Sequence, residues 1–539
     1  MRQGKMSLFT CVALIIGACI GSAIFSISGV TILYAGSSAV LSWIIAAAIY
    51  LGYGIVVTAL AVRYPYSGGI YVFPKLVFGS SVGSFWGYIS ACGYVVSNTI
   101  AIGFSAIYFG VYLQDGFPAL GSGPWPAILS CILSALVTIA GGKHFNRVQN
   151  TLVVLLLSCL SVYCAFALFG GGFDVSPFSS ENFFSSGVRG RTGFISAVPL
   201  ALVAYGGCIV VAFMASEVRS PGRNIPLSLL LGLCVVCAVY VLLIVGVVGT
   251  LPLENLKGGG DSCYIPLLAS VSQGPLLRYP FLKGLLSVSG AVAFLTTMIA
   301  LMAVNMKAIR AMVTPRQDKA SMPVLVFVLA CMALCLLKEW TMELISLGAI
   351  LNIVSMSITC FCLVKVGKKA LPLATIGVFL LCSVSDIMAG GGRIWVFTAA
   401  IYAVALSVYL FLRNKGKNYV LAVRGIVVHG KGHGHLHGMP TANLELLQDG
   451  GITLPHEGVW KTRTKIDGFT YASVTNVGLR PTDDDDKTPT IETYIIDFDK
   501  DIYGKEITVF FEEYIRPTRK FDSLDELRAQ IEKDIAACS

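Results

Sequence analysis

Residues 7–34 read SLFTCVALIIGACIGSAIFSISGVTILY, an apolar run without a single charged side chain. A run of this length can cross the hydrocarbon core of a bilayer as a helix, which takes about 20 residues. It has no small-residue cleavage site after it and is followed by many similar runs, so we interpret it as a membrane helix rather than a signal peptide. Gly17 and Gly21 lie near the centre of this run.

The whole chain repeats this pattern. Its 539 residues are 55% hydrophobic and only 13% charged, whereas soluble domains carry about 25% charged residues. We identify twelve apolar segments and predict a polytopic α-helical membrane domain with 12 transmembrane helices. These segments are 7–34, 38–62, 82–113, 125–141, 147–170, 192–215, 226–250, 280–305, 322–338, 341–366, 370–389 and 394–413.

Flanking charges orient these segments. If the N-terminus is cytoplasmic, the inside positions carry 18 Lys and Arg residues and the outside positions carry seven. The positive-inside rule then predicts a multi-pass protein of the cell (inner) membrane, with both termini in the cytoplasm. The basic surplus belongs to this membrane part, so we expect the lipid bilayer as a partner and no nucleic acid. Nothing in the sequence indicates the oligomeric state.

The composition changes near Lys417. From Asn418 onward the chain has 14 Lys and Arg against 20 Asp and Glu, whereas the preceding part has 25 against 10. Period-2 runs rich in Val, Ile, Thr and Tyr follow, broken by Gly, Asp and Pro, and Ser523–Ala537 closes the chain with a helical pattern. We predict a membrane domain over 1–413, a linker over 414–418 and a small antiparallel β-barrel domain with a C-terminal helix over 419–539.

Two membrane segments each contain a glycine-containing stretch at which the helix could be interrupted. Gly17–Phe25 lies in the first segment, and Tyr205-Gly206-Gly207 lies in the sixth. The glycines of the first segment alone could form a small-xxx-small packing seam. However, the first and sixth helices hold equivalent positions in two five-helix halves, where interrupted helices form substrate sites at the bilayer midplane.

These motifs, together with Tyr64–Tyr71 and Glu217–Pro226, resemble the amino acid–polyamine–organocation (APC) transporter superfamily over about residues 7–413. The resemblance implies a LeuT-type 5+5 inverted repeat and alternating access. It implies a substrate site at Gly17, Ile20, Gly21, Ser22, Ala23, Tyr205, Gly206 and Gly207. The chain departs from the family pattern at Ala23, where glycine is usual, and in the fifth segment, which has no interior lysine. The transported solute, riboflavin or an amino acid, and the coupling ion therefore remain open.

The tail contains HGKGHGHLHGMPTANL at residues 429–444. A His-rich tract suggests a metal site. The spacing fits no helix, however, and the interleaved glycines would orient the imidazoles poorly. Glycines let backbone amides approach a phosphate closely, but no Gly-x₄-Gly-Lys-Ser/Thr sequence is present, so the run is not a Walker-type loop.

This run and five later motifs resemble the riboflavin kinase (flavokinase) family over about residues 421–537. The later motifs are Gly458–Trp460, Thr475–Thr482, Ile491–Phe498, Asp501–Gly504 and Ile515–Leu524. The resemblance implies ATP, a divalent ion (Mg²⁺, with Zn²⁺ or Mn²⁺ as alternatives), riboflavin as substrate and FMN as product. Glu492 would be the catalytic base, and Thr441 and Asn443 would supply or orient the metal ligands. Further nucleotide-binding residues would be Gly430, Gly432, Gly434, Gly438, Pro440 and Arg516.

Two hypotheses follow from the fusion of these parts. In the first, the chain is bifunctional: the transporter imports riboflavin or a related compound and the kinase traps it as FMN. In the second, the chain is an amino-acid permease whose flavokinase-like tail senses flavin without turning it over. A broken first helix, suited to a carboxylate, is compatible with an amino acid substrate at least as well as with riboflavin.

Overall fold

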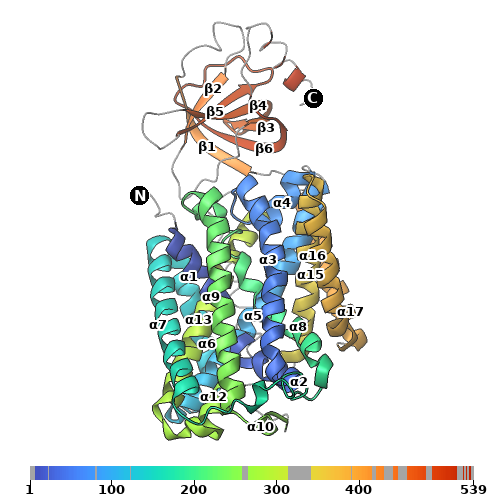
Figure 1. The fold of residues 1–539 in the computed structure, drawn as a ribbon. Coiled ribbons are helices and arrows are strands. Elements are labelled where there is room, and N and C mark those ends of the chain that lie inside the picture. The colour runs from blue at the N-terminus through green and yellow to red at the C-terminus, as the bar shows by residue number, and fades with distance from the viewer. Residues whose placement is uncertain are drawn as a thin grey trace. The chain divides into compact units, whose positions relative to one another are not determined.

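In the computed structural model the chain folds as two compact units, a helical one and one that contains the C-terminal β-structure (Figure 1). The structure describes residues 6–21, 23–78, 82–121, 123–257, 265–313, 341–389, 391–414, 421–429, 441–446, 458–480, 488–518, 526, 530 and 533–535.

The helical part consists mainly of apolar helices, of which Val82–Gly116 has 35 residues. Six stretches among the described residues are long and apolar enough to cross a membrane: Leu8–Arg63, Val82–Gly116, Gly142–Phe169, Pro221–Thr250, Phe281–Met312 and Ser346–Lys365. The predicted number of twelve spans is higher, and the predicted segment 322–338 lies outside the described residues. The helices are α1 Leu8–Cys19, α2 Ser28–Ala35, α3 Ala39–Arg63, α4 Gly69–Phe78, α5 Val82–Gly116, α6 Trp125–Ala140, α7 Gly142–Phe169, α8 Gly193–Val203, α9 Pro221–Thr250, α10 Glu254–Lys257, α12 Pro266–Gln273, α13 Phe281–Val313, α15 Thr341–Lys365, α16 Ala370–Ala389 and α17 Gly391–Asn414.

The first and sixth predicted segments are both interrupted, as their glycines indicated. Helix α1 begins at the N-cap Ser7, whose hydroxyl accepts from the amide of Thr10, and ends at Cys19. A π-helical turn over Ala23–Ile27 then leads into α2. Helix α8 ends at Val203, and a 3₁₀ turn over Gly206–Ile209 follows it. Backbone polar groups freed in this way must be satisfied inside the protein, because lipid offers no partner.

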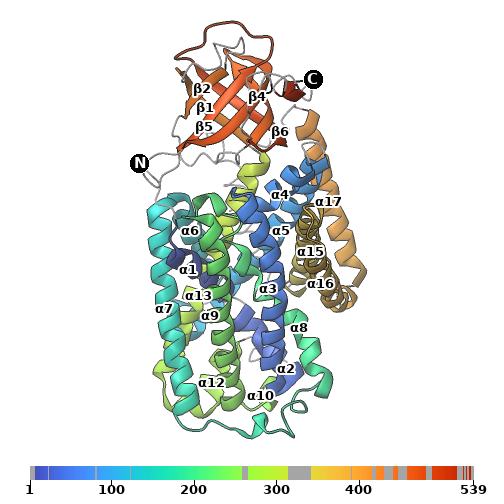
Figure 2. The ribbon, with the colours of Figure 1, turned by 45° about the horizontal axis from the view of Figure 1, so that its top comes forward.

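The β-structure is a closed six-stranded antiparallel barrel with strand order β1-β2-β5-β4-β3-β6, as predicted (Figure 2). Its short second strand was not among the period-2 runs, because its six residues alternate only briefly after the Gly/His run. Of the predicted C-terminal helix, the structure describes Glu526, Gln530 and Lys533–Ile535 as helical. The strands are β1 Leu421–Val428, β2 Thr441–Leu446, β3 Gly458–Ile466, β4 Phe469–Arg480, β5 Thr488–Ile495 and β6 Glu506–Arg516.

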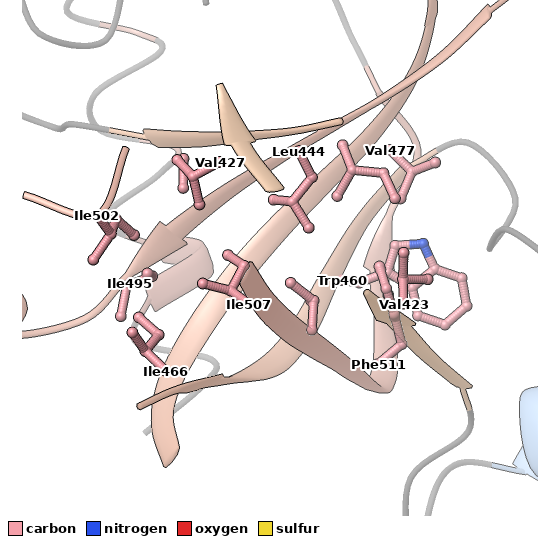
Figure 3. Packing of buried hydrophobic residues seen from close by; sticks show 13 residues of the cluster. Val423, Val427, Leu444, Trp460, Ile466, Val477, Ile495, Ile502, Ile507 and Phe511 are labelled. Atoms are coloured by element: carbon pink, nitrogen blue, oxygen red, sulfur yellow. The ribbon is translucent and has the colours of Figure 1, made fainter. Parts of the chain in front are cut away.

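Side chains of alternate residues fill the barrel, which fixes what faces outward. The apolar part of this core includes Trp460 and Phe511, whose rings meet edge to face with centroids 5.8 Å apart (Figure 3). Five buried hydroxyl side chains share the interior and bond to one another at 2.8–2.9 Å. They are Thr462, Thr464, Ser473, Thr475 and Thr493. Because successive strand residues point to opposite faces, the residues between these core positions face outward.

Candidate functional site

A row of three polar residues crosses the outer face of the barrel on strands β2, β5 and β4. Asn443 pairs with Glu492 in the β2–β5 ladder, and Asn476 pairs with the same Glu492 in the β4–β5 ladder. All three side chains are half-buried. Residues directly opposite one another in antiparallel strands have Cβ atoms about 4.5–5.5 Å apart on the same face. The Glu492 carboxylate is therefore flanked on both sides by a carboxamide.

The core residues of the same strands explain why these side chains face outward. Ala442 and Leu444 of β2 are buried, and so are Ile491 and Thr493 of β5. Period-2 alternation turns Thr441 and Asn443 of β2 away from the core together with Glu492. Thr441, Asn443 and Glu492 thus bring a hydroxyl, a carboxamide and a carboxylate to one face.

This donor set fits a hard divalent cation. Mg²⁺ prefers oxygen ligands, takes only one or two of them from the protein and keeps several waters and substrate oxygens. The hydroxyl of Thr441 and the amide oxygen of Asn443 are two such ligands at neighbouring outward positions of one strand. Among the described residues, no group of three or more His, Cys, Asp or Glu side chains could hold a metal ion.

Most of the Gly/His run lies outside the described residues. This includes the predicted phosphate-binding residues Gly430, Gly432, Gly434, Gly438 and Pro440. The one histidine of the run that is described, His429, stacks on Tyr503 with ring centroids 3.8 Å apart and an interplanar angle of 24°. At least this imidazole is therefore engaged in packing at the end of β1.

Arg516 lies at the end of β6 and holds the C-terminal segment. Its Nε lies 3.0 and 3.1 Å from the two carboxylate oxygens of Asp534, and its Nη2 lies 2.7 Å from Oδ2. Asp534 is 2% exposed and also accepts from the amide of Gln530 at 2.9 Å. A two-pronged arginine–carboxylate pair fixes orientation as well as charge.

Asn476 is a site residue that sequence reasoning did not single out. The Thr518 hydroxyl donates to its amide oxygen at 3.4 Å, so the segment directly after β6 reaches the polar row. The sequence carried a signal, since Asn476 is an outward residue in a strand pattern two positions before Gly478. Only the register of β4 on β5 shows that it lies beside Glu492.

A second candidate site lies in the helical part, where the two interrupted helices meet. The thiol of Cys19 lies 3.9 Å from the carbonyl oxygen of Tyr205, and the phenol of Tyr240 donates to Ala204 O at 3.1 Å and also to Cys19 O. The hydroxyl of Thr297 on α13 donates to Gly17 O at 2.9 Å. Side chains of α9 and α13 thus satisfy carbonyls that the interruptions set free.

The glycines at this meeting point permit close approach of the helices. A Cβ at Gly207 would lie 2.4 Å from the carbonyl carbon of Ala18, and one at Gly21 would lie 2.0 Å from Thr297 Oγ1. Of the predicted substrate-site residues, Gly17 lies on helix α1, which packs against the 3₁₀ turn that contains Gly206 and Gly207, and Tyr205 directly precedes that turn. Ile20, Gly21 and Ala23 follow α1 in the chain, and their place in a substrate site stays a prediction. Ser22 lies outside the described residues.

Comparison with known proteins defines the class of each part. The family model for amino acid permeases matches residues 6–427, and the chain belongs to this family. The family model for riboflavin kinase matches residues 417–539. The chain is thus a multi-pass membrane protein of the APC type with a C-terminal flavokinase domain.

Individual relatives match one part each. Over the tail, the chain is 35% identical across 121 residues to a bifunctional riboflavin kinase/FMN adenylyltransferase of Listeria monocytogenes, which covers 22% of this chain and 38% of that protein. Over the helical part it is 28% identical across 244 residues to the serine/threonine exchanger SteT of Bacillus subtilis (44% and 53%). It is also 30% identical across 269 residues to the aspartate-proton symporter of the same organism (48% and 50%). The chain therefore spans about half or less of the length of these relatives.

Proposed function

We propose that the chain is a bifunctional membrane protein in which a secondary transporter is joined to a cytoplasmic ATP:riboflavin 5′-phosphotransferase. The main support for this proposal is the register of strands β2, β5 and β4, which sets Glu492 between Asn443 and Asn476, with Thr441 on the same face. The boundaries proposed are 1–413 for the transporter, 414–418 for the linker and 419–539 for the kinase. Both termini are proposed to be cytoplasmic, where ATP is available.

In the proposed reaction, the riboflavin 5′-hydroxyl oxygen attacks the γ-phosphorus of ATP, and the bond from that phosphorus to the ADP oxygen breaks. Glu492 accepts the hydroxyl proton, and the flanking amides of Asn443 and Asn476 orient its carboxylate. Thr441 and Asn443 would hold Mg²⁺, which would neutralise phosphate charge when bound. Gly430, Gly432, Gly434, Gly438 and Pro440 are proposed as phosphate-binding residues from the family resemblance alone, and Arg516 is proposed as a further nucleotide-binding residue.

The kinase proposal is tested with the purified full chain, riboflavin, ATP and Mg²⁺, with FMN separated by chromatography. We expect FMN from the natural sequence and a loss of about 100-fold or more in Glu492→Gln, because a positioned base contributes about 10²–10⁴-fold. Removal of divalent ions with a chelator should abolish the activity and added Mg²⁺ should restore it. No FMN from the natural sequence would show that the tail is not a kinase.

The proposed role of the fusion is metabolic trapping. A transporter of neutral riboflavin equilibrates it across the bilayer, and phosphorylation converts it to an anion that the same path does not accept. The short linker keeps the two activities in one molecule.

A second candidate function is an amino-acid permease with a non-catalytic, flavin-sensing tail. It is favoured by two relatives of the helical part, a serine/threonine exchanger and an aspartate-proton symporter. Uptake of labelled riboflavin and labelled amino acids into vesicles that carry the full chain separates the two candidates.

A further inference from the structure

The interior of the barrel contains five hydroxyl side chains that are hydrogen-bonded in one continuous row. The row runs in the order Thr464, Ser473, Thr462, Thr475 and Thr493, and its four hydrogen bonds are 2.8–2.9 Å long. Each of the five side chains is at most 1% exposed. We call these five residues the hydroxyl network. Apolar side chains would fill the same interior without needing partners, so burial alone does not explain the network.

The last hydrogen bond of the hydroxyl network joins strands β4 and β5. Thr475 pairs with Thr493 in the ladder of these two strands, and their Oγ1 atoms lie 2.9 Å apart. Thr475 directly precedes Asn476, and Thr493 directly follows Glu492. The bond therefore lies inside the barrel, one residue away from the Asn476–Glu492 pair on the outer face.

Hairpin geometry sets the register of β3 on β4 but not that of β4 on β5. Only Asp467 and Gly468 connect the paired residues Ile466 and Phe469, and their φ angles are 48° and 92°. A two-residue turn with positive φ at both positions fixes the register of its hairpin. Strands β4 and β5 are connected by residues 481–487, which is too long a connection for such a turn. The register of β5 on β4 therefore depends on side chains.

The burial pattern alone leaves more than one register open to β5. A shift by one residue would turn the buried side chains outward and is excluded. A shift by two residues keeps the alternation of faces but takes Thr493 away from Thr475. The new neighbour of Thr493 would be Val477, which has no hydroxyl, or Ser473, whose hydroxyl already has two partners.

The hydroxyl network favours the observed register because buried hydroxyls need partners. A buried hydroxyl that loses its partner is costly, and a fully bonded buried network makes one arrangement of the core more favourable than the others. The same register decides the outer face. It sets Thr493 opposite Ala442 on β2 and, one residue along, Glu492 opposite Asn443.

We propose that Thr475 and Thr493 are positioning residues for the phosphoryl transfer. Their hydrogen bond inside the barrel holds β5 on β4 in the register that sets the Glu492 carboxylate beside Asn476 on the outer face. A misplacement of about 1 Å at a reacting group can lower the rate about 100-fold, so the fixed register affects turnover. The inference rests on the proposed kinase function and extends it from the outer face to the interior of the barrel.

The test is FMN formation by the purified full chain that carries Thr493→Val, which removes the hydroxyl and keeps the branched shape. Thr475 keeps its bond to Thr462 in this variant, so no other hydroxyl of the network is left without a partner. We expect kcat to fall about tenfold and the KM for ATP to change less than about twofold, because the proposed base is displaced and the proposed metal ligands on β2 are retained. Thr493→Ser keeps the hydroxyl and should retain kcat within about twofold.

Thr464→Val is the matched control. Thr464 is as buried as Thr493 and also ends the hydroxyl network, with a single bond to Ser473. Its strand belongs to the hairpin whose register the turn sets, so we expect kcat to stay within about twofold of the natural sequence. Because both variants lose one equivalent hydrogen bond, a general loss of stability would affect them alike.

Hydrogen exchange of the full chain, followed by mass spectrometry, guards against misfolded variants. The β5 peptide should exchange faster in Thr493→Val than in the natural sequence, and it should be unchanged in Thr464→Val. Exchange that is fast throughout the barrel in Thr493→Val would show misfolding, and Thr493→Ser against Thr464→Val then decides the inference: it is overturned if both have the same kcat below that of the natural sequence.

The outcomes separate this inference from the proposed function. A kcat of folded Thr493→Val equal to that of the natural sequence, or an equal fall of kcat in Thr493→Val and Thr464→Val, would overturn the inference and leave the kinase function standing. No FMN from the natural sequence would overturn the proposed function and, with it, the positioning role.

Discussion

At position 492 a carboxylate stands between two carboxamides, and the chemistry of the tail depends on that neighbourhood. Amide N–H groups from both sides can hold the carboxylate in one orientation, while the amide oxygens stay available to a metal or to Thr518. A general base must lie within hydrogen-bond reach of its proton, so orientation affects turnover directly.

Asn476→Ala should therefore lower kcat for FMN formation about tenfold and change the KM for ATP little. The physical reason is that Asn476 orients Glu492 and lies on the side of it opposite to the proposed metal ligands Thr441 and Asn443. Thr490→Ala is the matched control, since Thr490 lies two positions before Glu492 on the same strand face and bonds only weakly to Gly478 O, at 3.4 Å. Steady-state kinetics of both variants check this, and equal kcat values in the two would refute a role for Asn476.

At the scale of single elements, glycines and charge pairs fix how helices and strands meet. Gly207 lies against the backbone of Ala18, whereas Gly222 at the start of α9 has no atom within 4 Å of an added Cβ. We therefore expect alanine to be tolerated at position 222 and not at position 207. In an interrupted helix, close backbone approach is a structural need rather than a matter of helix propensity.

Gly207→Ala should abolish transport because its methyl group would push α1 away from the 3₁₀ turn that follows α8. Gly222→Ala should leave transport within about twofold of the natural sequence. Counterflow rates in liposomes, normalised to the amount of folded protein measured by gel filtration, give the comparison. Unimpaired transport by a folded Gly207→Ala protein would contradict the close contact.

The Arg516–Asp534 pair joins the last strand to the C-terminal segment. Removing one partner of a well-buried ion pair leaves the other uncompensated, which costs about 3–5 kcal/mol. The Lys505–Asp467 pair has a similar N–O distance of 2.7 Å, but its side chains are 48% and 63% exposed, and exposed pairs contribute about 0–1 kcal/mol.

Asp534→Ala should accordingly destabilise the barrel, and Lys505→Ala should not. Hydrogen exchange followed by mass spectrometry should show faster exchange of the β6 peptide and of its neighbour β3 in the first variant only. Similar exchange in both variants would mean that Asp534 contributes no more than a surface residue.

At the scale of the whole molecule, the prediction concerns the two activities together. Liposomes that carry the full chain and contain ATP and Mg²⁺ on the kinase side should accumulate FMN beyond the riboflavin equilibrium. Glu492→Gln should keep the initial rate of riboflavin entry and lose the accumulation, because it changes only the fate of riboflavin after entry. Loss of the initial rate in this variant would indicate that transport and phosphorylation are coupled.

Much of the architecture could be predicted, because it depends on local patterns. Apolar runs without charge indicated membrane helices, and period-2 runs indicated the barrel strands. The interruptions followed from Gly17, Gly21, Gly206 and Gly207. Strand β2 could not be identified, because six residues carry too little alternation to stand out. The register across three strands could not be predicted, since it depends on how distant segments pack.

The same division separates what the sequence determined by itself from what the tertiary structure decided. Local physics, meaning the hydrophobic length of helices, the alternation of strands and glycine at helix breaks, already specified a membrane protein with a β-barrel tail, and the resemblance of its motifs to riboflavin kinases indicated Glu492, Thr441 and Asn443. Only the folded chain set Asn476 beside Glu492 and Asp534 against Arg516. These pairs bring together residues from separate elements, and only long-range packing fixes their distances.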